Sequence, residues 1–583
     1  MPPLPFALVM CLTALAATPA FAQPATDAGA LQNQQQNQEK RFPDRLPETE
    51  RQTVHPALKE ADSIKVLIKG VRFSGALHLT TEEELQAVVA DAVGRELDFS
   101  GIEQITSWVT DFLKGKGWFL ARAYLPRQDI TDGVLEIILL EGRLDSGRGN
   151  GRAFTIVFDD KVPPRINPKH LEAIAARYLP TGATAREKDI ERALLLMKDL
   201  PGISARASLE AGSEADSTRI AIAAQEGSLF TGSVWLDNYG NRDTGEAQAN
   251  VALRLNDPLG IGDQAGFSGT HTEGIDLVGM TYTLPLGSQG LKLNAAVSGI
   301  RYEIIRGLGR DAGLKGGANI AGLTLSYPFI RTRVINFYGS FGYTAKALKD
   351  DSLAGNLRDK RLGNWSTGLS GDLLDTYGGG GITSANLNWT SGRLDLSANA
   401  ADAAIDSLTY RSRGAFNKFV YGLGRLQKLP GAFTLFARFS GQATQGNLDS
   451  AEKFILGGPY GVRAYSTSEA MGDSGWLANL ELRYDLPGGT PLGNLQLAAF
   501  ADTGHITLHD DPKDIPIATA TDRNSYPLSG WGIGMNLTKT GSHAVRLGWA
   551  GKIGDNPGRS VGGLDADSRN DKSRVWLQAS LWF

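Results

Sequence analysis

The chain has 583 residues, a formal net charge of −4 and a single cysteine. This length predicts more than one domain, and the lack of a basic cluster interleaved with aromatic residues argues against nucleic acid as a partner. Glycine is abundant at 70 residues while charged residues make up only 21%, a balance typical of many short strands joined by glycine-rich turns.

The first residues of the chain predict an export signal. Residues 6–17 form an apolar stretch, and residues 20–22 (Ala-Phe-Ala) form a small-x-small cleavage site. We therefore expect residues 1–22 to be a signal peptide. A membrane anchor and a lipid-modified Cys11 are the alternatives, but the apolar stretch is short for spanning and Met10 is not small. Cleavage would leave a mature protein without cysteine, which suits an oxidising compartment and excludes disulfides and thiol ligands.

A polar segment at residues 23–61 follows the signal. Residues 31–41 can form a helix, but this helix has almost no apolar face and would need a wet environment such as a channel lumen. A disordered linker is the alternative for this segment. Pro43, Pro47 and Pro56 predict extended chain after it.

Two similar α+β units come next, each with the predicted order β-α-α-β-β. In the first unit, at residues 64–144, Thr81 opens a helix with three glutamates in its first turn, where the helix dipole favours acids. The second unit, at residues 153–226, contains a helix that begins after Asn167 as the cap. The first unit has predicted strands at 66–73, 119–125 and 134–140 with a second helix over 102–113, and the second has strands at 154–158, 204–209 and 218–224 with helices at 168–178 and 190–197.

From Leu229 onward, strand-like stretches of about ten residues alternate with Gly, Asn, Asp and Pro turns. We interpret the longer polar segments at 348–360 and 510–526 as loops. Divided among strands of roughly ten residues, this region accommodates about 14 to 18 strands. The clearest predicted strands lie at 248–255, 275–284, 291–300, 334–344 and 495–501.

The last nine residues, 575–583, read Val-Trp-Leu-Gln-Ala-Ser-Leu-Trp-Phe, with apolar residues on one face of a strand. They are long enough to cross a bilayer as a tilted strand, and a membrane barrel must close because lipid does not tolerate an open sheet edge. We expect this strand to pair with the first barrel strand at 229–237. The alternative is a buried edge strand of a soluble sandwich. After residue 22 the sequence has no run of 18 apolar residues, so transmembrane helices are not expected.

Several motifs resemble the Omp85 superfamily, and more closely the TpsB transporters of two-partner secretion, the haemolysin-activator ShlB/FhaC/HecB-like family. The resemblance implies a signal peptide at 1–22, a plug helix and linker at 23–61, periplasmic POTRA domains at 62–148 and 149–227, and an outer-membrane β-barrel of about 16 antiparallel strands at 228–583. The motifs are residues 117–118, 123–126, 133–135 and 141–142 in the first unit, 193–202 in the second, and 237–240 and 256–260 at the start of the barrel.

The most specific resemblance is residues 457–465 (Gly-Gly-Pro-Tyr-Gly-Val-Arg-Ala-Tyr), which are similar to the family's VRGY/F loop motif, with Ala464 where the family usually has glycine. Phe500, Asp502 and Gly504 resemble its FxDxG strand motif, and the resemblance implies that Arg463 pairs with Asp502 inside the lumen. A charge-assisted bond would give the loop direction, while a solvated pair would stay weak enough to detach. The other loop-motif residues are Gly457, Gly458, Pro459, Gly461, Val462 and Tyr465.

The function implied is export of an unfolded partner exoprotein, such as an adhesin or a cytolysin, from the periplasm through the barrel. The sequence has no GxxxxGK[ST] motif, so no ATP site is predicted. An exposed sheet edge beside a helix can bind an extended segment by β-augmentation. The candidate groove in the first unit is lined by Ile105, Val109, Phe112, Phe119 and Tyr124; the alternative is that these apolar residues are core. Phe583 resembles the C-terminal aromatic residue that barrel-assembly machinery recognises, and outer-membrane lipid is the second expected partner.

Three other functions remain open for this chain: an assembly factor of the same superfamily, a passive porin related to haem or nutrients, and an outer-membrane enzyme. Two periplasmic units have no purpose in a porin, and the secretion-branch motifs argue against an assembly factor. The seven histidines are scattered and no GxSxG or HExxH motif occurs. The sequence therefore predicts no catalytic, cofactor-binding or metal-binding residue.

Overall fold

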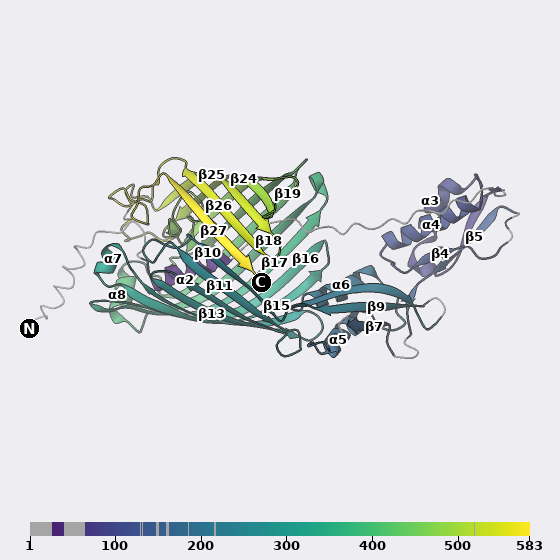
Figure 1. The fold of residues 1–583 in the computed structure, drawn as a ribbon, viewed down its shortest axis with the longest axis horizontal. Helices are drawn as coiled ribbons and strands as arrows, with labels where there is room; N and C mark the ends of the chain where they lie inside the picture. The colour runs from purple at the N-terminus through teal and green to yellow at the C-terminus, as the bar shows by residue number, and fades with distance from the viewer. Residues whose placement is uncertain are drawn as a thin grey trace, which may run out of the picture.

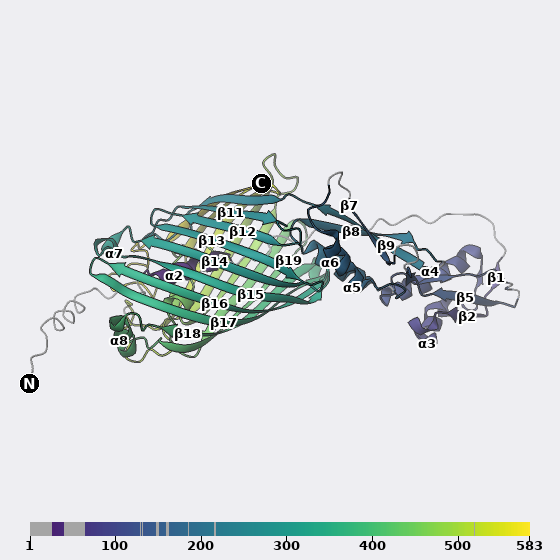
Figure 2. The same ribbon diagram turned by 90° about the horizontal axis from the view of Figure 1, so that it is seen from below.

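The computed structural model describes residues 26–39, 65–128, 130, 132–146, 151–158, 163–184, 186–214, 217–517 and 519–583. The predicted signal peptide at 1–22 and the predicted extended segment with Pro43, Pro47 and Pro56 lie outside these residues. Two small α+β modules extend in line from one end of a wide β-barrel, and a short helix lies inside the barrel (Figures 1 and 2). No helix in the described part of the chain is long and apolar enough to cross a bilayer.

The first module has the predicted β-α-α-β-β order. Thr81 caps α3 through a capping box with Glu84, and Asp98 caps α4. Its three-stranded sheet has the order β2-β5-β4, so β4 forms an edge beside α4. The predicted strand at 119–125 is shorter than expected, because only its middle pairs with β5. The elements are β1 (Val66–Leu67), β2 (Gly70–Gly75), α3 (Glu82–Val89), β3 (Glu96–Leu97), α4 (Phe99–Gly115), β4 (Arg122–Tyr124) and β5 (Val134–Leu140).

The second module repeats this order, and Asn167 caps its first helix as predicted. Its closing strands pair along their whole length, and β9 also pairs in parallel with β7. The helices cover one face of this sheet and bury an apolar core around Leu171, Met197 and Ile222. The elements are β6 (Arg143–Leu144), β7 (Phe154–Phe158), α5 (Pro168–Tyr178), α6 (Glu187–Lys198), β8 (Ile203–Ala211) and β9 (Ser217–Glu226).

Glu141 forms the polar part of the joint between the two modules. Its carboxylate accepts a hydrogen bond from Thr184 of the second module and contacts Arg143 at 2.8 Å and His78 at 3.2 Å. Burial raises the pKa of Glu141, but the hydrogen bonds from Thr184, Arg143 and His78 outweigh it and lower that pKa to about 2. Since the folded pKa is depressed, these contacts persist above the ordinary value of about 4.3 and are lost only as the pH falls toward 2.

The second module contacts the periplasmic turns of the barrel through α6. Asp199, which follows α6, receives two hydrogen bonds from the guanidinium of Arg331, at 2.7 and 2.9 Å. Arg192 donates to the carbonyl of Pro328 at 2.7 Å, and the first barrel turn reaches Asn167 through the carbonyl of Gly260. These contacts hold the module under the barrel mouth.

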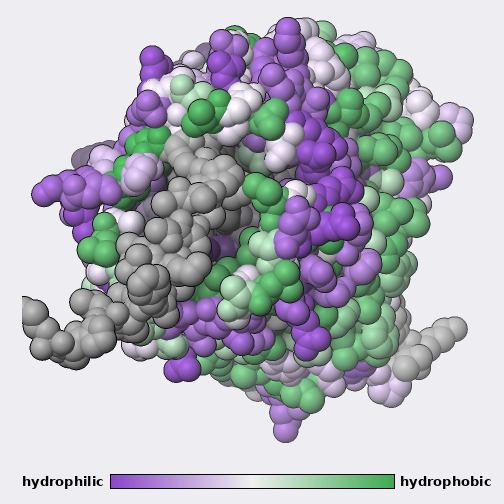
Figure 3. Space-filling view, turned by 90° about the vertical axis from the view of Figure 1, so that its left-hand side faces the viewer, coloured by the Kyte–Doolittle hydropathy of each residue, from purple (hydrophilic) through white to green (hydrophobic). Residues whose placement is uncertain are grey.

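The barrel is a closed antiparallel sheet of sixteen strands, which confirms the predicted architecture. Apolar side chains on its outer flank and hydrophilic side chains around the end away from the modules are visible in Figure 3. The strands are β10 (Phe230–Asp237), β11 (Gln248–Asn256), β12 (Gln264–His271), β13 (Ile275–Leu286), β14 (Leu291–Glu303), β15 (Lys315–Arg331), β16 (Ile335–Ser352), β17 (Gly355–Asp375), β18 (Gly381–Asp395), β19 (Gly414–Lys428), β20 (Phe433–Thr444), β23 (Ser474–Asp485), β24 (Asn494–Thr507), β25 (Ser525–Lys539), β26 (His543–Lys552) and β27 (Ser573–Trp582).

The barrel closes between its first and last strands, as the C-terminal sequence predicted. The register runs from Ser233 opposite Trp582 to Asp237 opposite Gln578. The backbone of Phe583 exchanges two hydrogen bonds with Gly232, at 2.8 and 3.1 Å. The terminal residue therefore completes the seam of the barrel.

The prediction of a loop at 348–360 is wrong. These residues form the ends of β16 and β17, which are joined by a tight turn at Leu353 and Ala354. Lys360 and Asp350 face the lumen, where Lys360 pairs with Asp449 and one carboxylate oxygen of Asp350 accepts a hydrogen bond from the Ala28 N–H. β16 and β17 have 18 and 21 residues, more than the roughly 9–11 that cross a bilayer, so their joined ends extend past the lipid. Neither face of a strand needs to be apolar there, and such a charged strand end looks like a loop in the sequence. The predicted loop at 510–526 does connect β24 to β25.

Candidate functional site in the barrel lumen

The lumen loop, residues 445–473, connects β20 to β23 and folds back into the barrel. It contains the 3₁₀ helix η4 (Ser450–Glu452) and a small hairpin formed by β21 (Phe454–Ile455) and β22 (Met471–Gly472). Gly458 adopts a φ of 107°, which favours glycine. The turn that carries the loop motif is closed by hydrogen bonds from Gly461 to Gly458 and from Val462 to Leu456.

The structure brings Arg463 and Asp502 together. Nε and one terminal nitrogen of Arg463 each donate to a different carboxylate oxygen of Asp502 at 2.8 Å, and the Arg463 backbone N–H donates to the same group at 3.1 Å. The other terminal nitrogen donates to Glu481 at 2.8 Å. This two-carboxylate arrangement uses the fixed fork of the guanidinium, which a lysine cannot reproduce.

The strand-motif residues support this contact from β24. The Arg463 guanidinium lies over the Phe500 ring, 3.3 Å from its centroid, and cation–π attraction adds to the ion pair. Asn479 donates to Asp502 at 2.7 Å and to the carbonyl of Gly461 at 3.1 Å, so it joins loop and wall. Gly504 has no side chain, which leaves space for Leu456 of the loop.

The remaining loop-motif residues shape the loop and pack it against the wall. Val462 and Tyr465 are fully buried in an apolar cluster with Leu456 and Phe500. Pro459 lines the neighbouring cavity, and Gly457 lies against the backbone of Ser466. Ala464 does not adopt a positive φ, so the alanine causes no strain there, and its methyl group packs against Gly530.

The ion pair of Arg463 and Asp502 differs from the expectation in one respect: it is buried and not solvated. The Asp502 side chain is 0% exposed and that of Arg463 is 18% exposed. Arg483 contacts Glu481 at 2.8 Å, so two arginines face two carboxylates and the cluster is neutral. Removing one member of a buried pair typically costs about 3–5 kcal/mol. The contact therefore holds the loop more tightly than a solvated pair would.

Sequence reasoning missed Glu481 and Trp576, which also contact Arg463. The indole N–H of Trp576 on β27 donates to the Arg463 carbonyl at 2.7 Å. The available signal was alternation on β23, where Asn479, Glu481 and Arg483 occupy every second position and so face the lumen together.

A second group of contacts fixes helix α2 (Ala28–Glu39) inside the lumen. Asp27, just before the helix, contacts Arg358 at 2.9 Å and Lys360 at 3.3 Å on β17, and accepts a hydrogen bond from Ser450 of the lumen loop at 2.8 Å. Lys360 also contacts Asp449 of the loop at 2.7 Å. Helix, loop and wall therefore meet at one buried ionic cluster.

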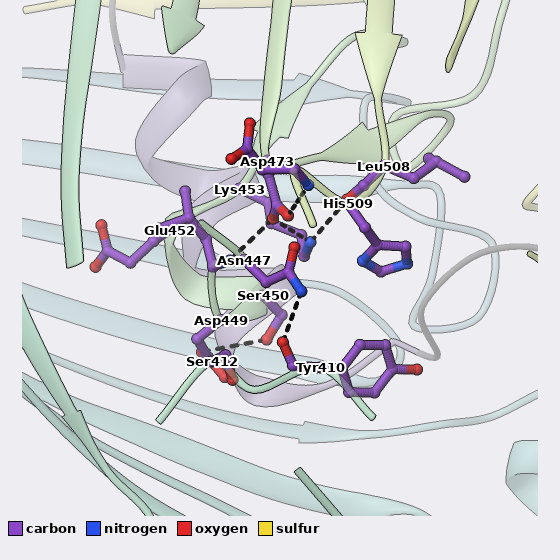
Figure 4. A network of polar contacts seen from close by, with 12 residues as sticks. Tyr410, Ser412, Asn447, Asp449, Ser450, Glu452, Lys453, Asp473, Leu508 and His509 are labelled. Carbon is purple, nitrogen blue, oxygen red and sulfur yellow. Dashed lines mark hydrogen bonds and ion pairs between the residues drawn. The ribbon is translucent and has the colours of Figure 1, made fainter. Parts of the chain in front are cut away.

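Three further ion pairs lie at the base of the lumen loop. Glu452 contacts Lys346 at 2.7 Å and Lys418 at 2.8 Å on the barrel wall. Figure 4 shows Lys453 beside Asp473 and the carbonyl of Leu508, to which it donates at 3.0 Å. The loop is thus attached at its base and at its tip by polar contacts, with apolar packing mainly near Tyr465.

The groove predicted in the first module needs a correction. Ile105 and Val109 are 0% exposed in the module core, so they do not line an open groove. Phe112 is half-buried, and Phe119 packs against the core of the second module. Tyr124 remains 41% exposed on the edge strand β4. These apolar positions at helical spacing are mostly core because the helix must cover a sheet.

Known proteins match this chain over nearly its whole length. The family described as haemolysin secretion/activation protein ShlB/FhaC/HecB matches residues 216–537, and the ShlB-type POTRA domain matches residues 66–142. The chain is similar to the heme/hemopexin transporter protein HuxB of Haemophilus influenzae (strain 86-028NP), with 22% identity over 85% of this chain and 83% of the relative. It is also similar to the outer membrane transporter CdiB of Escherichia coli, with 24% identity over 92% of this chain and 88% of the relative.

Solved structures share the fold. CdiB from Escherichia coli superimposes with a TM-score of 0.67 at 21% identity, covering 96% of this chain and 99% of that structure. CdiB from Acinetobacter baumannii gives a TM-score of 0.60 at 16% identity, covering 95% of this chain and 96% of the other.

Proposed function

Because this chain belongs to the haemolysin secretion/activation family of ShlB, FhaC and HecB, we propose that it exports a secreted partner protein across the outer membrane through its own barrel. The family is one of transporters rather than of enzymes. The observation that carries the proposal is the way the lumen is filled. A helix and a loop occupy it, and buried ion pairs rather than a continuous apolar core attach both to the wall.

The lumen in this state is closed to a protein chain. Helix α2 and the lumen loop must both leave their positions for a partner to pass, and both share the ionic cluster around Asp27, Lys360 and Asp449. Ion pairs suit a reversible closure, because water and alternative partners replace them at lower cost than they replace apolar packing. We assign Arg463 and Asp502 the role of holding the loop tip in the closed state.

The first module is the proposed receiver of the unfolded partner. Its edge strand β4 pairs with β5 on one side, and on the other side the Ala123 N–H donates to the Thr110 hydroxyl at 2.9 Å. An incoming extended segment would replace that hydroxyl and add a strand. Tyr124, 41% exposed on β4 itself, offers an apolar contact to a side chain of the segment.

The edge-strand contact is tested by Ala123→Pro. Proline removes only the outward N–H, and edge strands tolerate it. We expect export of the partner protein to fall, measured as its amount in the medium, while the heat-modifiable barrel in the outer membrane is unchanged. Thr110→Ala, which frees the same N–H, is the matched control and should export normally. Normal export by Ala123→Pro would exclude β4 as the receiving edge.

The same proposal gives a role to each segment before the barrel and to the last residue of the barrel. Residues 1–22 direct export to the periplasm, residues 23–61 supply plug and linker, and 62–148 and 149–227 form the two POTRA domains before the barrel at 228–583. Phe583 is 66% exposed at the periplasmic end of the seam. That position leaves its ring free for the barrel-assembly machinery before the strand meets outer-membrane lipid.

A further inference from the structure

An open groove runs along the outer, membrane-facing wall of the barrel across β13 to β18. Its volume is about 1250 Å³. The part of the groove nearer the middle of the membrane is lined by apolar side chains that point away from the lumen, namely Val278, Met280, Val297, Ala321, Tyr343 and Trp365. A second apolar groove of about 760 Å³ shares Met280, Val297 and Tyr343 with it and extends it toward the periplasmic half. A continuous apolar hollow on the lipid-facing wall suits acyl chains.

One side of the groove is an aromatic wall. The ring of Trp365 stacks on that of Phe341 with 5.3 Å between the ring centroids, and its centroid lies 4.8 Å from that of the Tyr343 ring. The Tyr343 hydroxyl lies over Gly363, where an added Cβ would come within 2.6 Å of it. The glycine therefore allows the tyrosine to lie flat across the wall, with its hydroxyl directed toward the charged end of the groove.

Three exposed arginines, Arg361, Arg393 and Arg413, line that charged end. In register, Arg361 lies opposite Asp395, and Arg393 lies opposite Gly363, whose missing side chain leaves room beside it. Within the described part of the chain, none of the three guanidiniums donates a hydrogen bond or forms an ion pair within 4.0 Å. Asp395 is the one carboxylate among the lining residues, so the charged end carries a surplus of two positive charges.

The position of the arginines places them in the outer leaflet. Arg361 lies near the start of β17, Arg393 near the end of β18, and Arg413 directly before β19. The loop that joins β18 to β19 and contains α8 (Ala400–Leu408) is at the opposite end of the barrel from the periplasmic modules (Figure 2). The apolar part of the groove lies between them and the middle of the membrane. Charge and apolar surface are therefore arranged in the same order as the headgroup and acyl chains of an outer-leaflet lipid.

We propose that this groove binds a phosphorylated, multiply acylated glycolipid of the lipid A type. Arginine forms bidentate, charge-assisted hydrogen bonds with phosphate, and clustered basic side chains at the membrane surface recognise anionic headgroups. The acyl chains would lie against Val278, Met280 and Val297 on one side and Tyr343 and Trp365 on the other. A bound lipid would also brace strands β16 to β18, whose lumen faces carry Lys346, Arg358 and Lys360, the residues that hold the lumen loop and helix α2.

The test compares two variants of the full chain purified from outer membranes in detergent. The first carries Arg361→Gln, Arg393→Gln and Arg413→Gln. The matched control carries Arg310→Gln, Lys513→Gln and Arg523→Gln, which change the net charge equally at exposed extracellular positions outside the groove. Binding of diphosphoryl lipid A is measured by native mass spectrometry, with dephosphorylated lipid A and phosphatidylglycerol as the other probes. Heat-modifiable migration verifies that each barrel is folded.

We expect the wild type and the control to retain diphosphoryl lipid A. The groove variant should retain at least about tenfold less of it, because three charge-assisted contacts are lost. Dephosphorylated lipid A and phosphatidylglycerol should bind the wild type more weakly than the diphosphoryl form. Equal retention by the groove variant and the wild type would overturn the proposal. Equal binding of the dephosphorylated lipid, or a dimer of this chain that occupies the groove in place of lipid, would do so as well.

Discussion

Arg463 holds the lumen loop through several contacts that depend on one another. Its guanidinium meets Asp502 and Glu481, stacks on Phe500, and its own carbonyl accepts from Trp576. Each partner comes from a different wall position, so the loop tip has one fitting orientation. A sequence motif predicts the arginine and one carboxylate. Strand alternation places Glu481 in the lumen, but only the pairing of β23 with β24 brings it to Arg463.

Arg463→Ala tests this contact at the residue scale. The substitution leaves Asp502 buried without its cation, a change that typically costs about 3–5 kcal/mol. We expect the loop tip to leave its position and export to fall on the order of tenfold, while the barrel still inserts and remains heat-modifiable. Arg254→Ala is the control, since Arg254 also faces the lumen but donates no side-chain hydrogen bond within the described residues. Unchanged export by a well-expressed Arg463→Ala variant would contradict the assigned role.

Helix α2 shows how an element can be stable without an apolar face. Gln32, Gln34 and Gln35 are buried in the barrel while Gln36 is exposed, and of the described side chains only Ala28 and Leu31 join an apolar cluster. A polar sequence of this kind is equally compatible with a disordered linker. The surrounding wall and loop decide between the two, because they supply Arg358, Lys360 and Ser450 to the start of the helix.

The close approach of this helix to the lumen loop gives a test at the scale of the element. A Cβ added at Gly29 would lie 2.5 Å from the Ser450 hydroxyl and 2.9 Å from the Ala451 nitrogen. Gly29→Leu therefore separates helix and loop without lowering helix propensity. We expect more frequent open-channel events in planar bilayers. Gln36→Leu, at an exposed position of the same helix, is the control and should conduct like the wild type; if both variants conduct alike, this contact does not close the pore.

The whole molecule places a receiver, a joint and a closed pore in line. The first module touches the second through Glu141 and Thr184, and the second touches the barrel through Asp199 and Arg331. The first module also contributes Leu120 to the apolar core of the second, and Phe119 packs against that core, so removal of the first module exposes part of it. The barrel itself depends on neither module for its closure.

Deletion of residues 64–142, which leaves β6 of the second module in place, tests the molecule at this scale. We expect export to be abolished, because the proposed receiving edge is lost, while the barrel still reaches the outer membrane and migrates in its heat-modifiable form. The readouts are the secreted protein in the medium and the migration of the barrel before and after heating. Persistent export by the truncated chain would mean that the second module or the barrel receives the partner.

The sequence by itself determined the elements whose pattern is local: the capped helices, the paired β-α-α-β-β units, the alternating barrel strands and the closing strand that ends at Phe583. Only the tertiary structure decided that residues 348–360 are strands, that Ile105 and Val109 are core, and that Arg463 binds two carboxylates. The reason is physical. Periodicity reports which faces of one element are apolar, whereas a barrel lumen is polar and buried, and its contacts join residues hundreds of positions apart, as Asp27 and Lys360 are.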